Sequence, residues 1–266
     1  MPRQPREHSP TSIYHIMSRG INKMEIFQDT HDRQKYLDIL HRVKVKYGFE
    51  LYSFCLMTNH THLLIKETDA EIAKVMASIN IRYSMFFNKK YSRVGSLFQE
   101  RYRSEPILWE AQCLVCARYI HNNPVKAGIV DAPQDYRWSS YHDYVQKTGN
   151  PLLAKATLLE LFDQDPASSL RQFVQFTETR NEDRFLDYDV PQPDVKDHLQ
   201  QAEIFLRDRF NIRAEEVRSM EYHRRCTIIV KILAEIKLPQ EKLGQVLGMS
   251  SDAIYRAKKK IMDSLV

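Results

Sequence analysis

Strand-like and helix-like segments alternate along residues 13–123, and this order limits the possible folds more than any other feature of the chain. Short runs rich in β-branched and aromatic residues indicate strands, whereas apolar residues with a period of about 3.6 indicate helices. The predicted strands cover residues 13–20, 49–57, 60–67 and 102–108. The predicted helices cover residues 29–47, 70–91 and 110–123.

The order strand, helix, strand, strand, helix, strand, helix predicts an α+β fold of the ferredoxin-like (RRM-like) kind. In this plan an antiparallel sheet carries helices on one face, and its open face is available for chemistry. Local signals support the helix boundaries. Asp29 suits the N-cap of the first helix, and Pro124 is expected to stop the third.

Two histidines, His60 and His62, stand one residue apart in the segment NHTHLLI, residues 59–65. Because side chains alternate between the two faces of a strand, both imidazoles are expected on the same face. Two neighbouring imidazoles make half of a metal site. A pair of this kind is more often structural, so the histidines alone do not decide between the two interpretations.

Tyr119 and Asn123 are four residues apart in the third predicted helix and therefore share one of its faces. The side-chain oxygen of Asn123 could join the two imidazoles around one divalent ion. Mixed nitrogen and oxygen ligands suit Mg²⁺ or Mn²⁺ and do not exclude Zn²⁺. A phosphate bound to such an ion becomes more electrophilic, and attack by a nearby phenol gives a phosphotyrosine link. Because such a link keeps the energy of the phosphoester bond, this chemistry could cut and rejoin DNA without ATP.

Five segments within residues 13–144 carry a family signature: YHIMSRGINKMEIFQD, CLMTNHTHLLI, RYSMFFNKKYSRVGSLFQERYRSEPI, RYIHNNPVKAGIV and YRWSSY. Together they resemble the REP-associated tyrosine transposases of the HUH single-tyrosine transposase superfamily. The resemblance implies a metal held by His60 and His62 with Asn123 as third ligand. It also implies that Tyr119 is the nucleophile that keeps the 5′ phosphate, and that the substrate is single-stranded DNA beside a hairpin.

One position departs from the family pattern, since Thr61 replaces the bulky apolar residue that usually separates the two histidines. Its side chain is expected on the opposite face of the strand, where it affects packing more than metal binding. Two alternatives to the transposase remain. One is a hairpin-binding protein or transcriptional regulator without catalytic activity, and the other is a replication or conjugation nickase of the same superfamily.

Basic and aromatic residues near these motifs suit a groove for single-stranded DNA. The residues expected to neutralise phosphates are Arg19, Arg82, Lys89, Lys90, Arg93, Arg101 and Arg103. The residues that can stack on bases or fill the core are Tyr83, Phe86, Phe87, Phe98 and Tyr102. For the phenylalanines of the helix at residues 70–91, the core is the expected place.

The chain changes character after residue 145. Residues 1–145 are interpreted as the HUH domain, and residues 146–195, which are polar and contain several prolines, as a connecting segment. Residues 196–266 show no strand pattern and are interpreted as a helical DNA-binding domain.

The C-terminal domain contains a helix, a tight turn at Gly248 and a second helix, which is the helix-turn-helix pattern. The second helix carries the basic residues Arg256, Lys258, Lys259 and Lys260 on its outer side. The segment is similar to the helical DNA-binding domain of the bacterial replication initiator. This resemblance implies contact with duplex DNA, and the alternative is a helical hairpin that only packs within the protein.

The composition is that of an ordinary globular protein, with 266 residues and a net charge of +5 that permits a nucleic-acid partner without demanding one. The spacing of Cys55, Cys113, Cys116 and Cys226 gives no disulfide framework, so intracellular thiols are expected. The N-terminus lacks the apolar stretch of a signal peptide, and no run reaches the roughly 18 apolar residues that span a bilayer. We expect a cytoplasmic, nucleoid-associated monomer or homodimer without a membrane partner.

Overall fold

The computed structural model describes residues 7–146, 149–187, 195–236 and 240–263. It divides into two compact units, Met1–Tyr188 and Asp189–Val266. Each unit has its own cluster of buried apolar side chains. The two units are therefore described separately.

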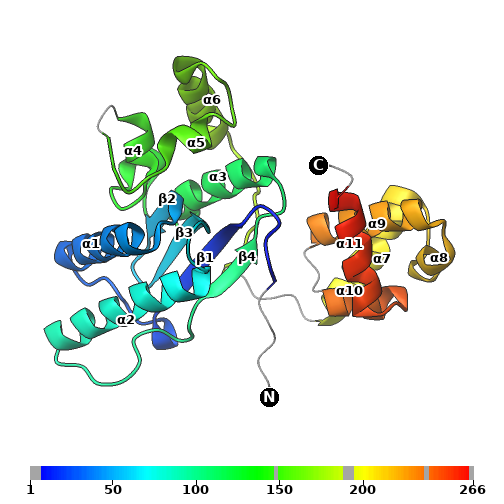
Figure 1. Cartoon of the computed structure of the whole chain (residues 1–266), viewed down its shortest axis with the longest axis horizontal. Coiled ribbons are helices and arrows are strands. Elements are labelled where there is room, and N and C mark those ends of the chain that lie inside the picture. The colour runs from blue at the N-terminus through cyan, green and yellow to red at the C-terminus, as the bar shows by residue number, and fades with distance from the viewer. Residues whose placement is uncertain (1–6, 147–148, 188–194, 237–239, 264–266) are drawn as a thin grey trace. The chain divides into compact units, whose positions relative to one another are not determined.

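The first unit is built on a four-stranded sheet (Figure 1). Its strands are β1 (Ile13–Arg19), β2 (Glu50–Leu56), β3 (His60–Lys66) and β4 (Arg103–Pro106). They lie in the order β2-β3-β1-β4, and every neighbouring pair is antiparallel. The four predicted strands and the antiparallel sheet are confirmed.

Two helices, α1 (Thr30–Tyr47) and α2 (Ile72–Lys90), pack against each other and lie on one face of this sheet (Figure 1). Asp29 caps α1 as predicted, because its side chain accepts a hydrogen bond from the backbone of Asp32. On the sheet, Thr61 points towards these helices and lies 3.4 Å from the hydroxyl of Tyr36. Thr61 thus faces away from the histidines, as expected from the alternation of a strand.

The third helix, α3 (Glu110–Lys126), contacts β2 and β3 from the opposite face (Figure 1). The prediction that helices cover only one face is therefore wrong. The physical reason lies in the strands themselves, since every residue of β1 and the first six residues of β3 are buried. Strands that are buried on both faces need cover on both sides.

The prediction that Pro124 stops α3 is also wrong, because the helix ends at Lys126, three residues after its predicted end at residue 123. Proline fixes φ at a helical value, so the helix continues past Pro124 to Lys126 without the one backbone hydrogen bond that a proline cannot donate. The backbone N–H of Ala127 donates to the carbonyl of Asn123, and the helix ends there. Asn123 therefore has helical geometry and stays on the face that carries Tyr119.

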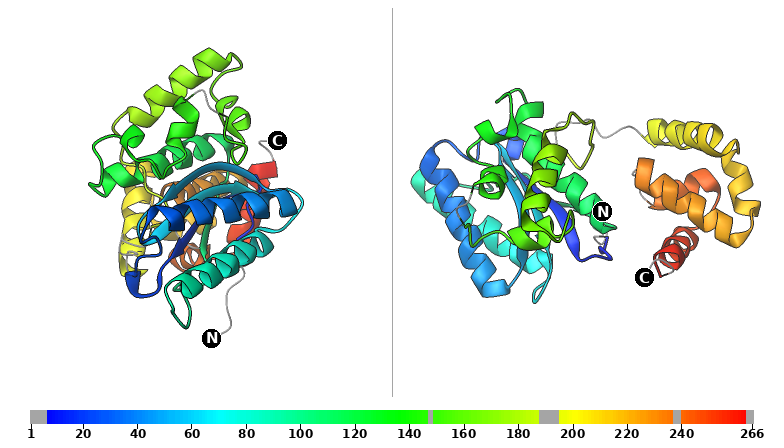
Figure 2. Two further views of the ribbon diagram at one scale, coloured as in Figure 1. Left: turned by 90° about the vertical axis from the view of Figure 1, so that its left-hand side faces the viewer. Right: turned by 90° about the horizontal axis from the view of Figure 1, so that it is seen from above.

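The first unit extends beyond residue 145, so the proposed connecting segment is in part structured. The unit also contains the helices α4 (Tyr141–Val145), α5 (Lys155–Leu159) and α6 (Pro166–Glu178) (Figure 2). The α6 helix contacts α3, α4 and α5, and α5 also contacts β2. Phe173 of α6 anchors them, because its ring packs against Tyr141, Tyr144 and His121. Two short 3-10 helices, Ile21–Lys23 and Pro133–Asp135, complete the unit.

The secondary structure described in the second unit is helical: α7 (Val195–Phe210), α8 (Ala214–Ser219), α9 (Tyr222–Ile236), α10 (Gln240–Leu247) and α11 (Ser251–Asp263). Gly248 between α10 and α11 has a φ of 60°, a left-handed conformation that glycine adopts without strain. Among the described helices of the whole chain, none is both long and apolar enough to cross a membrane.

Candidate functional site

Three histidines, His15, His60 and His62, lie together on the face of the sheet that α3 covers. The register of β1 and β3 pairs Arg19 with His60 and Met17 with His62. The rings of His60 and His62 are 4.9 Å apart between centroids, and Nε2 of His15 lies 2.9 Å from Nδ1 of His62. Spacing within one strand predicts the first pair. His15 was missed, because only the register between two strands brings it to this place.

The histidine pair is buried and has the chemistry of a metal site. His60 is 6% exposed and His62 is fully buried. Burial, and then the neighbouring His60 and His15, lower the pKa of His62 well below its ordinary value. Its Nε2 is buried without a hydrogen-bond partner among the described residues. A neutral imidazole with a free ring nitrogen is the form that binds a cation, so these residues fit a divalent metal.

Tyr119 lies against the same histidines. Its ring is edge-on to His62, with 5.9 Å between centroids, and edge-on to His15, with 5.8 Å. Its hydroxyl donates a hydrogen bond of 2.9 Å to Oδ2 of Asp187. Burial, and then the charge of Asp187, raise the pKa of Tyr119. The predicted nucleophile and the predicted metal ligands are thus neighbours, with the phenol held in its protonated form.

Residues 183–187, here called the covering segment, lie over Tyr119. The ring of Phe185 packs at 5.3 Å from that of Tyr119 and at 5.9 Å from that of His15. Asp183 anchors the segment through an ion pair with Arg118, whose Nε lies 2.7 Å from Oδ2. As a result Tyr119 is only 4% exposed. The sequence gives no signal for this arrangement, since Tyr119 and Asp187 are 68 residues apart.

Asn123 lies one helical turn after Tyr119 and is 6% exposed. Its Nδ2 donates to the backbone carbonyl of Tyr119 at 3.1 Å. A hydrogen bond from its side chain also lowers the pKa of Tyr119, against the larger effects of burial and Asp187. The structure therefore brings Asn123 together with the predicted nucleophile, and its role as a metal ligand stays a prediction.

Comparison with known proteins finds a family likeness in the part of the chain that carries these residues. Residues 9–123 match the family described as "Transposase IS200 like". These residues are therefore similar to the IS200-like transposases, and the part of the chain that they define is called the IS200-like domain below. A putative REP-associated tyrosine transposase of Haemophilus influenzae is 31% identical over 108 residues, which cover 36% of this chain and 61% of that protein. A solved REP-associated tyrosine transposase bound to a REP hairpin has a TM-score of 0.48 and 18% identity, and the match covers 57% of this chain and 90% of that chain.

Two of the predicted DNA-binding residues of the IS200-like domain share the sheet face with the histidines. Arg19 pairs in register with His60 and is 4% exposed. Arg103 pairs with Met17, the residue across from His62, and its Nε lies 2.6 Å from Oε1 of Glu100. Both arginines thus belong to the strand face that carries the imidazoles, and their contact with DNA stays a prediction.

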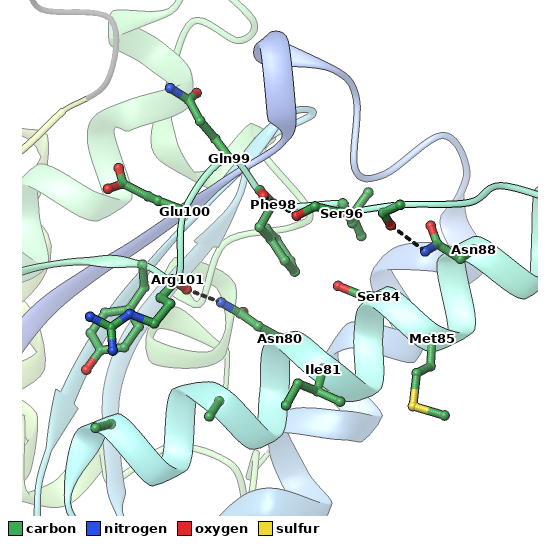
Figure 3. A pocket seen from close by; sticks show the side chains of 15 residues that line it. Asn80, Ile81, Ser84, Met85, Asn88, Ser96, Phe98, Gln99, Glu100 and Arg101 are labelled. Atoms are coloured by element: carbon green, nitrogen blue, oxygen red, sulfur yellow. Dashed lines mark hydrogen bonds between the residues drawn. The ribbon is translucent and has the colours of Figure 1, made fainter.

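Other predicted DNA-binding residues of the IS200-like domain lie on α2 and after it. Arg82 and Lys89 are exposed on α2, and Arg93 donates to the side chain of Asn88. Arg101 lines a groove of about 610 Å³ between α2 and residues 95–102 (Figure 3). The groove wall is largely apolar, with Ile81 60% exposed and Met85 69% exposed.

The aromatic residues of this region mostly fill the core of the IS200-like domain. Tyr83 and Phe87 are fully buried, and Phe98 and Tyr102 are each 6% exposed. Phe86 is partly buried against the same core. The expected place of the α2 phenylalanines in the core is confirmed.

A second group of possible metal ligands, Asp29, His31 and Asp32, lies at the start of α1. Lys90 already occupies this place, because its Nζ lies 2.6 Å from Asp29 and 2.7 Å from Asp32. Both carboxylates also form the capping box of α1. The positive charge of Lys90 is thus paired with carboxylates inside the IS200-like domain. The two aspartates act as a helix cap.

Proposed function

We propose that the IS200-like domain is a ferredoxin-like, metal-dependent endonuclease and strand transferase. It acts on single-stranded DNA next to hairpins, through a covalent 5′-phosphotyrosine on Tyr119. The observation that carries this proposal is the position of Tyr119 beside His62, whose buried Nε2 has no partner among the described residues. The relative named a putative REP-associated tyrosine transposase supports the choice of a tyrosine transposase.

His60 and His62 would hold the divalent ion, Mg²⁺ or Mn²⁺, with Asn123 as the proposed third ligand. When bound, the ion makes a phosphate more electrophilic and neutralises charge that develops on it. Arg19, on the same face, adds positive charge for the phosphate. Tyr119 attacks phosphorus, the new bond joins its oxygen to the 5′ phosphate, and the bond to the 3′ oxygen breaks. The phenol loses its proton and the 3′ oxygen gains one.

The covering segment must move before this reaction can take place. Phe185 packs on the ring of Tyr119 and Asp187 holds its hydroxyl, so a phosphate cannot reach the nucleophile in the arrangement seen. The same contacts support a second candidate function, a hairpin-binding protein or regulator that does not cleave DNA. The two candidates differ in whether a covalent protein–DNA adduct forms.

The test is incubation of the full chain with 5′- and 3′-labelled hairpin DNA that carries single-stranded flanks, with Mn²⁺, Mg²⁺ or a chelator. We expect a metal-dependent adduct in the wild type and none in Tyr119→Phe. Tyr141→Phe is the matched control, because Tyr141 is also buried and also donates to a carboxylate, Glu178, at 2.9 Å. Tight binding without an adduct under all metals would favour the second candidate.

For the second unit, we propose a helix-turn-helix that binds duplex DNA. Several local features support it. Ser250 caps α11 by accepting from the N–H of Ala253, and Ile254 of α11 is fully buried. On the outer side Arg256, Lys259 and Lys260 are exposed, while Lys258 is half-buried. A buried inner face and a basic outer face suit a helix placed in a major groove.

The test is duplex binding by the full chain carrying Arg256→Glu together with Lys259→Glu. We expect weaker duplex binding at low salt and unchanged hairpin cleavage. Arg207→Glu, an exposed position on α7, is the control. An equal loss of duplex binding in Arg207→Glu would mean that the total charge of the protein, and not the basic side of α11, determines the binding.

A further inference from the structure

The face that holds His60 and His62 contains a third imidazole for which the transposase chemistry has no assigned use. We propose that His15 is a positioning residue, which orients His62 and fixes its tautomer so that Nε2 of His62 is the atom offered to the metal. The inference rests on the proposed metal site, and it concerns a hydrogen bond that exists in the protein without the metal.

The contact between His15 and His62 has the geometry of a hydrogen bond between coplanar rings. Nε2 of His15 lies 2.9 Å from Nδ1 of His62, and the rings are 5.2 Å apart with only 9° between their planes. Both side chains are fully buried. The strand register creates the contact, because His62 pairs with Met17 and His15 is the diagonal neighbour of that pair.

Each neutral imidazole carries one proton, so this bond can run in two directions. If His15 donated, His62 would keep its proton on Nε2, which has no acceptor among the described residues. If His62 donates from Nδ1, the lone pair of its Nε2 stays available for a cation. The second direction leaves no buried donor unsatisfied on His62. It places the remaining ring proton on Nδ1 of His15, which has no hydrogen-bond partner among the described residues but lies 3.9 Å from Oε2 of Glu105.

Glu105 favours the same direction. Its Oε2 lies 3.9 Å from Nδ1 of His15, on the side of the ring away from His62. A carboxylate there attracts a proton on Nδ1 of His15 and repels a lone pair. With its proton on Nδ1, His15 presents the lone pair of Nε2 to His62. The backbone N–H of Leu186 holds the same oxygen of Glu105 at 2.7 Å, so the carboxylate is fixed in place.

The resulting chain runs from Glu105 through His15 to His62 and ends at a free ring nitrogen. Partners of this kind behind a metal-binding histidine set its tautomer and orientation, and their loss typically weakens metal binding by about 10- to 100-fold. A buried histidine with a purely structural role would affect folding without affecting the metal. His121 provides that comparison, because it is fully buried and its Nε2 lies 2.8 Å from Oγ of Ser140.

The first measurement needs no variant. Nitrogen-15 NMR of histidine-labelled full-length protein, without metal, reports which ring nitrogen carries the proton. We expect His62, identified by loss of its signals in His62→Gln, to carry its proton on Nδ1. A His62 that carries its proton on Nε2 in the wild type would overturn the proposal.

The second measurement is Mn²⁺ affinity, read from the electron paramagnetic resonance signal of free Mn²⁺. We expect His15→Leu to bind Mn²⁺ about 10- to 100-fold more weakly, and His15→Gln, whose side-chain oxygen can accept from His62, to recover most of that loss. His121→Gln should bind as the wild type does. Wild-type affinity in a folded His15→Leu, or no Mn²⁺ binding by the wild type, would refute the assignment. Normal Mn²⁺ binding without any DNA adduct would count against the proposed function and leave the role of His15 standing.

Discussion

The hydroxyl of Tyr119 donates a hydrogen bond of 2.9 Å to the carboxylate of Asp187. This bond joins the predicted nucleophile to the covering segment, residues 183–187. A carboxylate next to a phenol opposes loss of the phenolic proton, and burial opposes it further. The same bond therefore holds Tyr119 in place and keeps it in its less reactive form.

Replacement of Asp187 by asparagine should lower the pKa of Tyr119, since the substitution removes the negative charge and keeps a polar partner. Phenolate forms as the pH rises towards that pKa, so at any pH below it the variant has more phenolate. Each unit by which the pKa falls increases the fraction of phenolate about tenfold. The rate of adduct formation measured against pH should rise at lower pH than in the wild type. Glu178→Gln, which changes the partner of Tyr141, is the control, and a lower rate in Asp187→Asn at every pH would contradict the prediction.

Release of the covering segment should accelerate cleavage. Arg118 and Asp183 form an ion pair with two short contacts, 2.7 and 2.9 Å, between side chains that are 14% and 11% exposed. A hydrogen bond to a charged group contributes about 1.5–3 kcal/mol, so Asp183→Ala should increase the open population, and the initial rate of adduct formation, by about tenfold or more.

The charge swap Arg118→Asp with Asp183→Arg should restore the slow rate, which separates the ion pair from other effects of the substitution. Limited proteolysis near residue 183 gives an independent reading of release. A segment that becomes sensitive to protease while the rate of adduct formation stays unchanged would show that its position does not control access to Tyr119.

The spacing of residues within one element predicted which side chains of the candidate site lie close together. The two-residue period of β3 placed His60 and His62 on one face and Thr61 on the other, and the structure confirms that Thr61 faces Tyr36. The four-residue spacing of Tyr119 and Asn123 likewise follows from one helix. Such relationships depend on local geometry alone, and a sequence contains that geometry directly.

The partners that were missed come from other elements. His15 reaches His62 across 47 residues through the register of β1 and β3, and Asp187 reaches Tyr119 across 68 residues. A shift of one residue in the register would turn His15 to the other face, and hydrophobic periodicity does not define register that closely. The position of α3 on the second face of the sheet was also not predicted. Polar histidines that alternate along β3 suggest a face open to solvent, whereas that face is buried.

Two groups of residues offer cation ligands, and their substitution should give opposite results. His62→Ala should abolish Mn²⁺ binding and adduct formation, since Nε2 of His62 is a buried, unbonded ring nitrogen in the described part of the chain. His31→Ala should leave both unchanged, because Asp29 and Asp32 next to it already accept from Lys90. Isothermal titration with Mn²⁺ compares the two, and the reverse pattern would move the metal to the start of α1.

Acid should destabilise the first unit through His121. Burial lowers the pKa of His121 to about 3, against an ordinary value of 6.5. Between these values the unfolded chain binds a proton that the folded chain does not, so stability is present above about pH 6.5 and is lost as the pH falls. From pH 7 to pH 5 this histidine should reduce the free energy of unfolding by about 2 kcal/mol.

Urea unfolding at several pH values, followed by tryptophan fluorescence, measures this effect, because both tryptophans, Trp109 and Trp138, lie in the first unit. His121→Gln should be less stable at pH 7, since the imidazole fills a pocket among Tyr141, Tyr144 and Phe173. Its stability should nevertheless decline less steeply towards pH 5 than that of the wild type. His41→Gln removes an exposed imidazole from α1 and is the control. An unchanged slope in His121→Gln would show that other groups account for the sensitivity to acid.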